Sequence, residues 1–147
     1  LKGKRIINML RIKLLLTFLV LLILTACGGA ATPSAPVADT DVLNLPQTVN
    51  VETVASIQDR DDVILIDVRE QSEYDAGHIP GITLVPMSEI QNRLDEIPTD
   101  KEVIVTCRSG NRSGQVTDFL RKNGFDNVHN MQGGIVAWEQ AGYPVEQ

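Results

Sequence analysis

Two short, uninterrupted runs of mainly β-branched residues restrict this chain to few folds: Val63-Ile64-Leu65-Ile66 and Val103-Ile104-Val105. Alternating polar and apolar residues would indicate strands with one solvated face. Continuous apolar runs are instead typical of strands that are buried on both faces of a parallel sheet. Three weaker strand candidates complete the pattern: Thr48–Asn50, Ile82–Val85 and Asn127–His129.

Apolar residues at helical spacing lie between these strand candidates. Strands that alternate with helices predict an α/β domain with right-handed crossovers and with helices on both faces of the sheet. The predicted helices are Val51–Gln58, a helix opened by the capping box Ser88-Glu89-Ile90-Gln91 with Ile90, Leu94 and Ile97 inward, a helix with Val116, Phe119 and Leu120 inward and a left-handed cap at Gly124, and about Gly134–Ala141 with Ile135 and Trp138 inward.

The first 26 residues have the pattern of a secretory signal peptide. Five basic residues and no acidic residue precede or adjoin the apolar run Leu14–Leu24, and small residues follow it. The sequence Leu24-Thr25-Ala26-Cys27 resembles a bacterial lipoprotein box, which implies that Cys27 is acylated and anchors the chain to a membrane. Two alternatives stay open: a permanent anchor helix, although the run is shorter than the ~18 to 20 residues of a spanning helix, and a Cys27 that is incidental or paired with Cys107.

The chain therefore divides into three parts. Residues 1–26 are the predicted signal peptide, and residues 27–46 are the predicted lipidated cysteine and a flexible tether rich in Gly, Ala, Thr, Pro and Ser. Residues 47–147 form the predicted domain, which is long enough for one core without disulfides. We expect this domain to be extracytoplasmic, on the periplasmic or outer-surface side of a bacterial membrane.

The part of the chain after residue 26 is strongly acidic. The whole chain carries a net charge of −6, but all 19 acidic residues and only eight of the 13 basic residues follow residue 26, which gives this part a charge of −11. Such a charge disfavours nucleic acid and anionic lipid as ligands. Any anion that binds must be held by a local positive field.

Both strong strands end in polar residues, and ligands of parallel α/β sheets bind beside the carboxyl ends of the strands. The first strand ends in Asp67-Val68-Arg69-Glu70. The second leads into the loop Cys107-Arg108-Ser109-Gly110-Asn111-Arg112-Ser113, and a helix is expected to begin near Ser113. Gly110 permits backbone conformations that would turn successive amides inward, and the helix N-terminus adds positive potential. With Arg108 and Arg112 beside it, Cys107 is expected to have a lowered pKa and to be a thiolate near neutral pH.

This loop resembles the active-site loop of rhodanese (thiosulfate sulfurtransferase) domains, and two further motifs resemble the same family. The chain is therefore identified as a single-domain member on three ordered motifs that span nearly all of residues 47–147. The resemblance implies a rhodanese-like α/β fold with a central, mostly parallel five-stranded sheet. The further motifs are Ile66-Asp67-Val68-Arg69-Glu70 followed by Glu73-Tyr74-Asp75-Ala76-Gly77-His78-Ile79-Pro80-Gly81, and Met131-Gln132-Gly133-Gly134-Ile135-Val136-Ala137-Trp138 followed by Gly142-Tyr143-Pro144.

The resemblance implies sulfur transfer by double displacement. Cys107 would take a sulfane sulfur from thiosulfate or a similar donor, hold it as a persulfide, and pass it to cyanide or a thiol. Arg108 would attract the anionic donor and Arg112 would brace the loop from within, while Ser109, Gly110 and Asn111 would supply backbone amides. The loop from Cys107 to Arg112 has six residues, as in the sulfurtransferases, whereas related phosphatases and arsenate reductases have one residue more.

The remaining polar residues are expected to have structural roles. Asp67 and Arg69, together with Ser113, would support the loop, and His78 and His129 would hold neighbouring segments. Cys107, His78 and His129 lack the spacing of metal ligands, so neither a metal nor another cofactor is expected. Two other functions stay open: a non-catalytic rhodanese-like module that binds a partner or senses redox state, and, disfavoured by loop length, a phosphatase or arsenate reductase.

Overall fold

The computed structural model describes residues 43–147. The predicted signal peptide, Cys27 and nearly all of the tether lie outside these residues. Within residues 43–147, the helices are all too short or too polar to cross a lipid bilayer.

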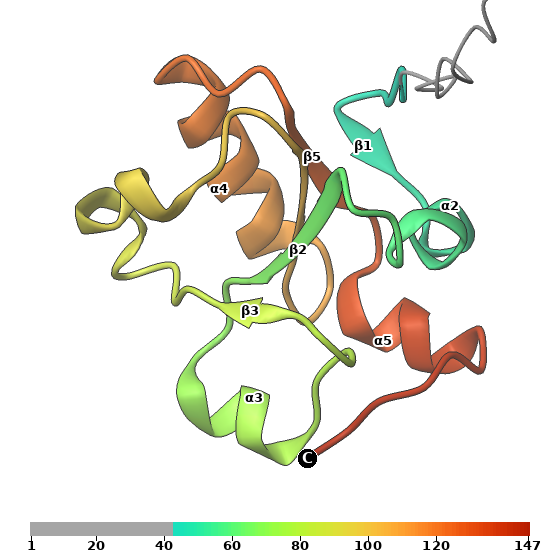
Figure 1. Cartoon of the computed structure of the whole chain (residues 1–147). Coiled ribbons are helices and arrows are strands. Elements are labelled where there is room, and N and C mark those ends of the chain that lie inside the picture. Colours follow the sequence, from blue (N-terminus) through green and yellow to red (C-terminus); the bar gives the residue numbers. More distant parts are fainter. Residues whose placement is uncertain (1–42) are drawn as a thin grey trace, which may run out of the picture. The chain divides into compact units, whose positions relative to one another are not determined.

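Five strands form one sheet in the order β1-β5-β4-β2-β3, and every strand pair is parallel. The fold class is therefore confirmed, and the sheet, predicted to be mostly parallel, is parallel throughout. The two strong strands of the sequence pattern, β2 and β4, are neighbours near its centre (Figure 1). The strands are β1 (Thr48–Val49), β2 (Val63–Asp67), β3 (Thr83–Leu84), β4 (Glu102–Thr106) and β5 (Val128–Met131).

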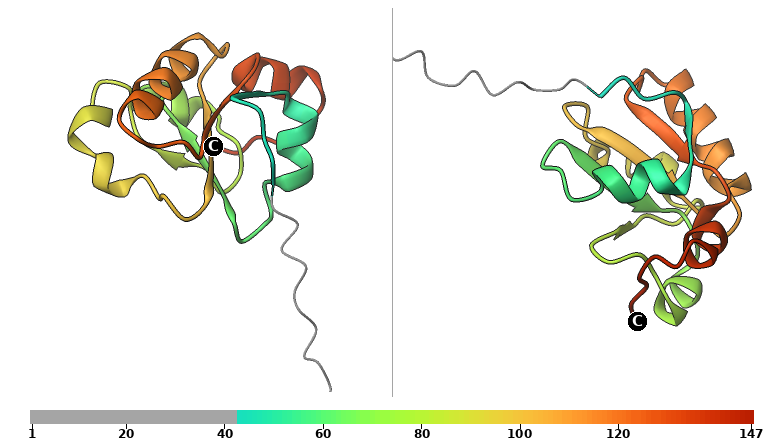
Figure 2. Two further views of the ribbon diagram at one scale, coloured as in Figure 1. Left: turned by 90° about the horizontal axis from the view of Figure 1, so that it is seen from above. Right: turned by 90° about the vertical axis from the view of Figure 1, so that its right-hand side faces the viewer.

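Helices cover both faces of the sheet. α2 (Val51–Ile57) and α5 (Gly134–Gln140) lie on one side, and α4 (Asn111–Lys122) lies on the other, as the views in Figures 1 and 2 agree. Each face has its own apolar cluster, and successive residues of a strand alternate between them. In β2, for example, Leu65 packs into the α2 and α5 cluster, whereas Ile66 packs into the cluster with α4. The continuous apolar runs are thus explained by burial on both faces.

The helix predicted from the capping box at Ser88 is wrong. The chain forms two 3₁₀ turns there, η1 (Ile90–Asn92) and η2 (Leu94–Glu96), because Arg93 between them leaves helical geometry at φ −125° and ψ 27°. Arg93 forms ion pairs with Glu89 and Glu96 on either side of this break. Ile90 and Ile97 are buried as predicted.

One helix was not predicted from the sequence, α3 (Gln71–Ala76). It has six residues and none of them is buried, so it has no apolar periodicity to find. Its N-terminus is instead stabilised by a capping box, in which the side chains of Glu70 and Glu73 each accept a hydrogen bond from the other residue's backbone amide.

Both histidines hold segments of backbone, in line with the structural roles predicted for them. The ring of His129 lies 2.7 Å from the carbonyl of Pro46 and 2.7 Å from a carboxylate oxygen of Glu102. The ring of His78 stacks on Tyr74, and its backbone pairs with Glu146 near the carboxyl terminus. The chain entering the domain and the chain leaving it are therefore both tied to the core.

Candidate active site

Cys107 follows β4 directly and is 1% exposed. In the register of the two central strands Asp67 lies opposite Thr106, so the carboxyl ends of β2 and β4 stop at the same edge of the sheet. The loop after β4 then leads into α4, which begins at Asn111, two residues before the predicted start. The polar ends of both strong strands are therefore neighbours, as the sequence indicated.

The sulfur of Cys107 accepts hydrogen bonds from its own loop. The Gly110 amide donates to Sγ at 3.2 Å and the Ser113 hydroxyl donates to it at 3.4 Å. Burial acts to raise the pKa of the Cys107 thiol, but hydrogen bonds from the Ser113 hydroxyl and from the amides of Ser113, Ser109 and Gly110 lower it below its ordinary value. The site thus favours a thiolate, which is the nucleophilic form of cysteine.

The source of this pKa depression agrees with the prediction in part. We expected inward-pointing loop amides, the helix N-terminus and the guanidinium groups of Arg108 and Arg112 to lower the pKa of Cys107. The main groups that lower it are three backbone amides, as expected, and the hydroxyl of Ser113, which was not foreseen in this role. Donors of this kind are fixed in place by the fold, so they act without side-chain rearrangement.

Gly110 lets the loop turn its amide toward the sulfur. Its φ is +90°, in the left-handed region that favours glycine. A Cβ at this position would lie 3.0 Å from the Gly133 amide nitrogen, so a side chain would also crowd the backbone before α5.

The amino end of α5 holds the other side of the loop. The Ile135 amide donates to the carbonyl of Cys107 at 2.9 Å, and the Val136 amide donates to the carbonyl of Arg108 at 3.1 Å. In a trans peptide the N–H points opposite to the preceding C=O, so these bonds direct the Ser109 amide away from α5 and toward the sulfur. The Gly133-Gly134 pair makes this approach possible, because a Cβ on Gly134 would collide with the Cys107 and Arg108 backbone.

Asn130 of β5 is a site residue that sequence reasoning missed. The fully buried Ser113 hydroxyl lies 2.6 Å from the Asn130 side-chain oxygen and 3.4 Å from Sγ of Cys107. A hydroxyl has a single proton, so the Asn130 oxygen and the Cys107 sulfur compete for donation from Ser113. Asn130 lies 23 positions after Cys107 on another strand, and nothing in the sequence pattern marks it.

Arg112 was expected to brace the loop from within, but its side chain bonds to another helix. Its guanidinium forms a bidentate pair with Glu73 of α3, with both bonds at 2.7 Å. This pair lowers the pKa of Glu73 to about 2. Arg112 therefore ties α4 to α3 across the site.

Asp67 and Arg69 form a buried ion pair at 2.7 Å, with side chains 1% and 6% exposed. They were expected to support the cysteine loop, but their side chains bond elsewhere: Arg69 donates to the carbonyls of Glu73 and Gly77 at 3.1 and 2.7 Å. The pair thus joins the end of β2 to α3 and to its C-cap residue, and it positions one wall of the site.

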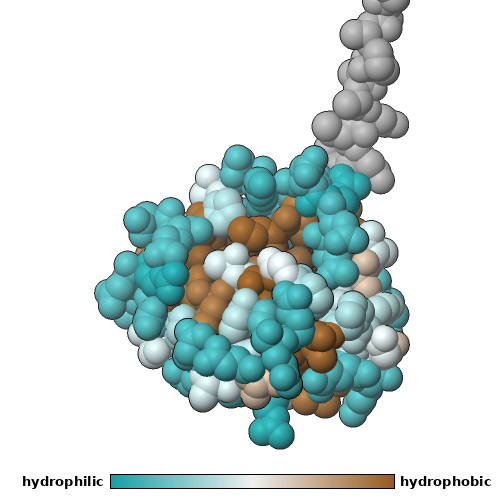
Figure 3. Space-filling view, turned by 60° about the horizontal axis from the view of Figure 1, so that its bottom comes forward, coloured by the Kyte–Doolittle hydropathy of each residue, from teal (hydrophilic) through white to brown (hydrophobic). Residues whose placement is uncertain are grey.

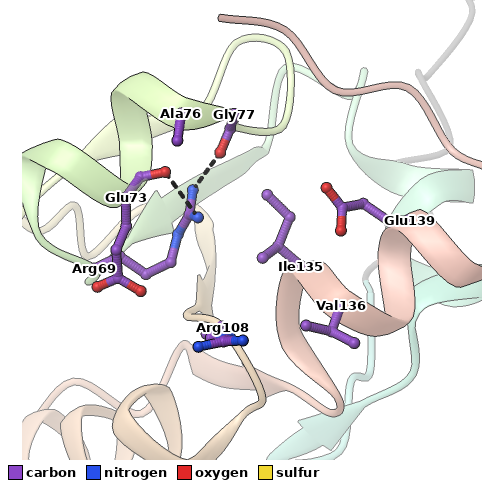
Figure 4. Close-up of a pocket in the computed structure, with 8 residues that line it drawn as sticks. All are labelled: Arg69, Glu73, Ala76, Gly77, Arg108, Ile135, Val136 and Glu139. Atoms are coloured by element: carbon purple, nitrogen blue, oxygen red, sulfur yellow. Dashed lines mark hydrogen bonds between the residues drawn. The ribbon is translucent and has the colours of Figure 1, made fainter.

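A pocket of about 320 Å³ opens beside the loop, between α3 and α5. Figure 3 shows the end of the molecule that carries these helices, where apolar surface gathers in the middle and hydrophilic residues surround it. The side chains that line the pocket are drawn in Figure 4. They are Arg69, Glu73, Ala76, Gly77, Arg108, Ile135, Val136 and Glu139.

The described residues contain no cluster of three or more histidine, cysteine, aspartate or glutamate side chains that could hold a metal ion. The chemistry available at this edge of the sheet is that of Cys107 and of the hydrogen-bond donors around it. Within residues 43–147 Cys107 is a free thiol.

The fold and the site together define a class of parallel α/β domains in which a buried thiol lies in an amide-lined loop after a central strand. The comparisons identify the family within this class. The family model described as a rhodanese-like domain matches residues 50–141, and the chain belongs to this family.

Several of the relatives are named sulfurtransferases. A protein named sulfurtransferase from Allochromatium vinosum is 42% identical over 89 residues, which cover 60% of this chain and 83% of the relative. A protein named thiosulfate sulfurtransferase GlpE from Pseudoalteromonas translucida is 32% identical over 93 residues, which cover 63% of this chain and 89% of the relative. The crystal structure of a rhodanese-related protein from Thermoplasma volcanium superimposes with a TM-score of 0.64 at 31% identity, over 69% of this chain and 98% of that chain.

Proposed function

We propose that the domain is a sulfurtransferase that carries a sulfane sulfur on Cys107 as a persulfide. The observation that carries this proposal is the set of hydrogen bonds that Sγ accepts from its loop and from Ser113, in a loop whose next residue, Arg108, lines an open pocket. The chain also belongs to a family whose named relatives include sulfurtransferases.

The proposed reaction has two displacements. The Cys107 thiolate attacks the outer sulfur of thiosulfate, the bond between the two sulfur atoms of thiosulfate breaks, and sulfite leaves with its electron pair. Cyanide or a thiolate then attacks the outer sulfur of the persulfide. The S–S bond breaks and Cys107 is released again as a thiolate, so no net oxidant or reductant is required.

The chain's own groups have separate roles in this scheme. The amides of Ser109 and Gly110 and the hydroxyl of Ser113 stabilise negative charge on the thiolate and on the departing sulfur. Arg108 is exposed at the pocket and attracts an anionic donor that the acidic body of the domain would repel.

The test uses the full chain with thiosulfate, followed by intact-mass measurement. We expect one added sulfur on the wild type, which cyanide removes as thiocyanate, and no added sulfur on Cys107→Ser. Cys27→Ser is the matched control, because it removes the chain's other cysteine and leaves the loop untouched. A folded protein with reduced Cys107 that takes no sulfur from thiosulfate or any other sulfane donor would contradict the proposal and favour a binding module.

We also propose that Cys27 carries lipid and attaches the domain to the outer side of a bacterial membrane. The support is the signal pattern of residues 1–26 and the sequence Leu24-Thr25-Ala26-Cys27. In bacterial cells grown with radiolabelled palmitate, the wild type should incorporate label and Cys27→Ser should not. Equal labelling of both proteins would refute lipidation at this residue.

A further inference from the structure

The pocket beside the Cys107 loop is lined by four charged side chains, and two of them are already paired with opposite charges. Arg69 is paired with Asp67, and Glu73 is paired with Arg112. The other two, Arg108 and Glu139, are exposed, and within residues 43–147 no hydrogen bond or ion pair reaches either side chain. The pocket therefore presents one positive and one negative group to a ligand.

These two groups stand apart along an apolar wall. Glu139 follows Ile135 by one helical turn in α5, so both face the pocket, and Val136 adds to the same surface. In Figure 4 Ile135 and Val136 lie between Arg108 and the Glu139 carboxylate. Such an arrangement suits a small ligand that offers a cationic group to Glu139 and carries an anionic group that the positive charge of Arg108 attracts.

We infer that the acceptor of the persulfide sulfur is a small zwitterionic aminothiol and that Glu139 selects its ammonium group. This inference rests on the proposed function. The acceptor's ammonium would pair with Glu139, the positive charge of Arg108 would attract its carboxylate, and its thiolate would attack the outer sulfur of the Cys107 persulfide. The thiolate forms a new S–S bond with that sulfur, the bond to Cys107 breaks, and Cys107 leaves as a thiolate.

Thiosulfate matches the two charged groups of this pocket poorly. It is a dianion with no cationic group, so Glu139 repels it while Arg108 attracts it. Glu139 is thus a specificity residue for the second displacement and lies outside the groups that carry out the sulfur chemistry.

The experiment measures the discharge of the persulfide in a single turnover. The full chain is loaded with thiosulfate and freed of excess donor, and it then receives either cysteine or 3-mercaptopropionate below saturation. These two thiols share the carbon chain and the carboxylate, and only cysteine has the ammonium group. Wild type is compared with Glu139→Gln and with the matched control Glu52→Gln, which removes an exposed carboxylate on α2.

The ratio of the two discharge rates is the quantity of interest, since the intrinsic reactivity of each thiol cancels between variants. We expect Glu139→Gln to lower the cysteine to 3-mercaptopropionate ratio about two- to fivefold, the range of an exposed ion pair, and Glu52→Gln to leave it unchanged. High salt should lower the wild-type ratio in the same direction.

The failures of the two proposals are distinguishable. A wild type that loads sulfur but shows the same ratio as Glu139→Gln overturns the role of Glu139 and leaves the sulfurtransferase proposal standing. A wild type that takes no sulfur in the loading step overturns both.

Discussion

The two central strands end side by side, with Asp67 opposite Thr106, in very different surroundings. At the end of β2, charged groups neutralise each other: Asp67 pairs with Arg69, and Arg69 also donates to backbone carbonyls of α3. At the end of β4, the sulfur of Cys107 is surrounded by donors that come from its own loop. One strand end is a closed ion-pair network and the other is a preorganised anion site.

This difference shows that, at one edge of a sheet, one strand end can hold elements together while its neighbour stabilises a charged group. Charges that neutralise each other hold elements together but cannot stabilise a new charge. Backbone amides that converge on a single atom can do so without any movement. The following experiments perturb the two strand ends separately, beginning with the contact that joins the β4 loop to α5.

The largest effect is expected from Gly134→Ala. Its φ is +60°, and an added Cβ would lie 2.6 Å from the Arg108 carbonyl carbon, where only backbone could move. We expect the free energy of unfolding, measured in urea, to fall by about 4 kcal/mol or more, because both strain and steric overlap result. Sulfur loading of Cys107 should be lost as well.

Gly142→Ala is the matched control for this substitution. Gly142 also has a positive φ, +80°, but an added Cβ there meets nothing within 4 Å. Its loss of unfolding free energy should be only about 1 kcal/mol, the conformational part alone. Equal losses of unfolding free energy in the two variants would show that the close contact between α5 and the Cys107 loop contributes nothing to stability.

The next effect is expected at the β2 end. Asp67→Asn leaves the Arg69 charge buried without its carboxylate, which should lower the free energy of unfolding by about 3 kcal/mol. Below the unfolding transition the variant should still load sulfur, since neither residue bonds to the Cys107 loop. Asp62→Asn breaks an exposed pair with Arg60 and should leave the urea midpoint nearly unchanged. A loss of sulfur loading by folded Asp67→Asn would contradict the division between the two strand ends.

The sequence was sufficient for the features that depend on neighbouring residues. The runs in β2 and β4, the left-handed cap at Gly124 and the position of Cys107 after a buried strand are all local patterns, and the structure has them. Predictions from local patterns failed in segments where few side chains are buried. The capping box at Ser88 opens no α-helix, and α3 forms with no buried side chain.

The parts of the site that were not foreseen come from distant segments. Asn130 reaches Ser113 from β5, and the glycine pair before α5 touches the Cys107 loop only because the fold brings them together. The role of Arg112 was also misjudged, because its partner Glu73 lies 39 residues away on an unpredicted helix. Spacing along the chain was enough to single out Cys107, but three-dimensional contacts decide which groups change its pKa.

Removing the Ser113 hydroxyl tests the β4 end on a smaller scale. Ser113→Ala should raise the pKa of Cys107, because one of the hydrogen bonds that lower it is lost. The rate at which Cys107 is alkylated in the folded protein at pH 6, followed by mass spectrometry of the peptide that contains it, should fall several-fold. Ser109→Ala is the matched control, since this residue acts through its backbone amide, and its rate should match the wild type. A slower rate in both variants would mean that the hydroxyl of Ser113 has no special role.

The smallest effect is expected from the bridge between the two regions, Glu73 and Arg112. The folded-state pKa of Glu73 is about 2, lowered mainly by its hydrogen bonds to Arg112, against an ordinary value of 4.5. Because folding depresses this pKa, the stabilisation is complete above about pH 4.5 and is lost as the pH falls toward 2.

Both side chains are about a third exposed, so the contribution should stay below about 1 kcal/mol. Urea unfolding from pH 6 to pH 2 should therefore show a gap between wild type and Glu73→Gln that closes over the acid range. Glu52→Gln, on the exposed face of α2, should follow the wild type throughout. A gap that persists at pH 2 would mean that Glu73 stabilises α3 through its capping-box bond and not through its charge, and the two strand ends would then be electrostatically independent.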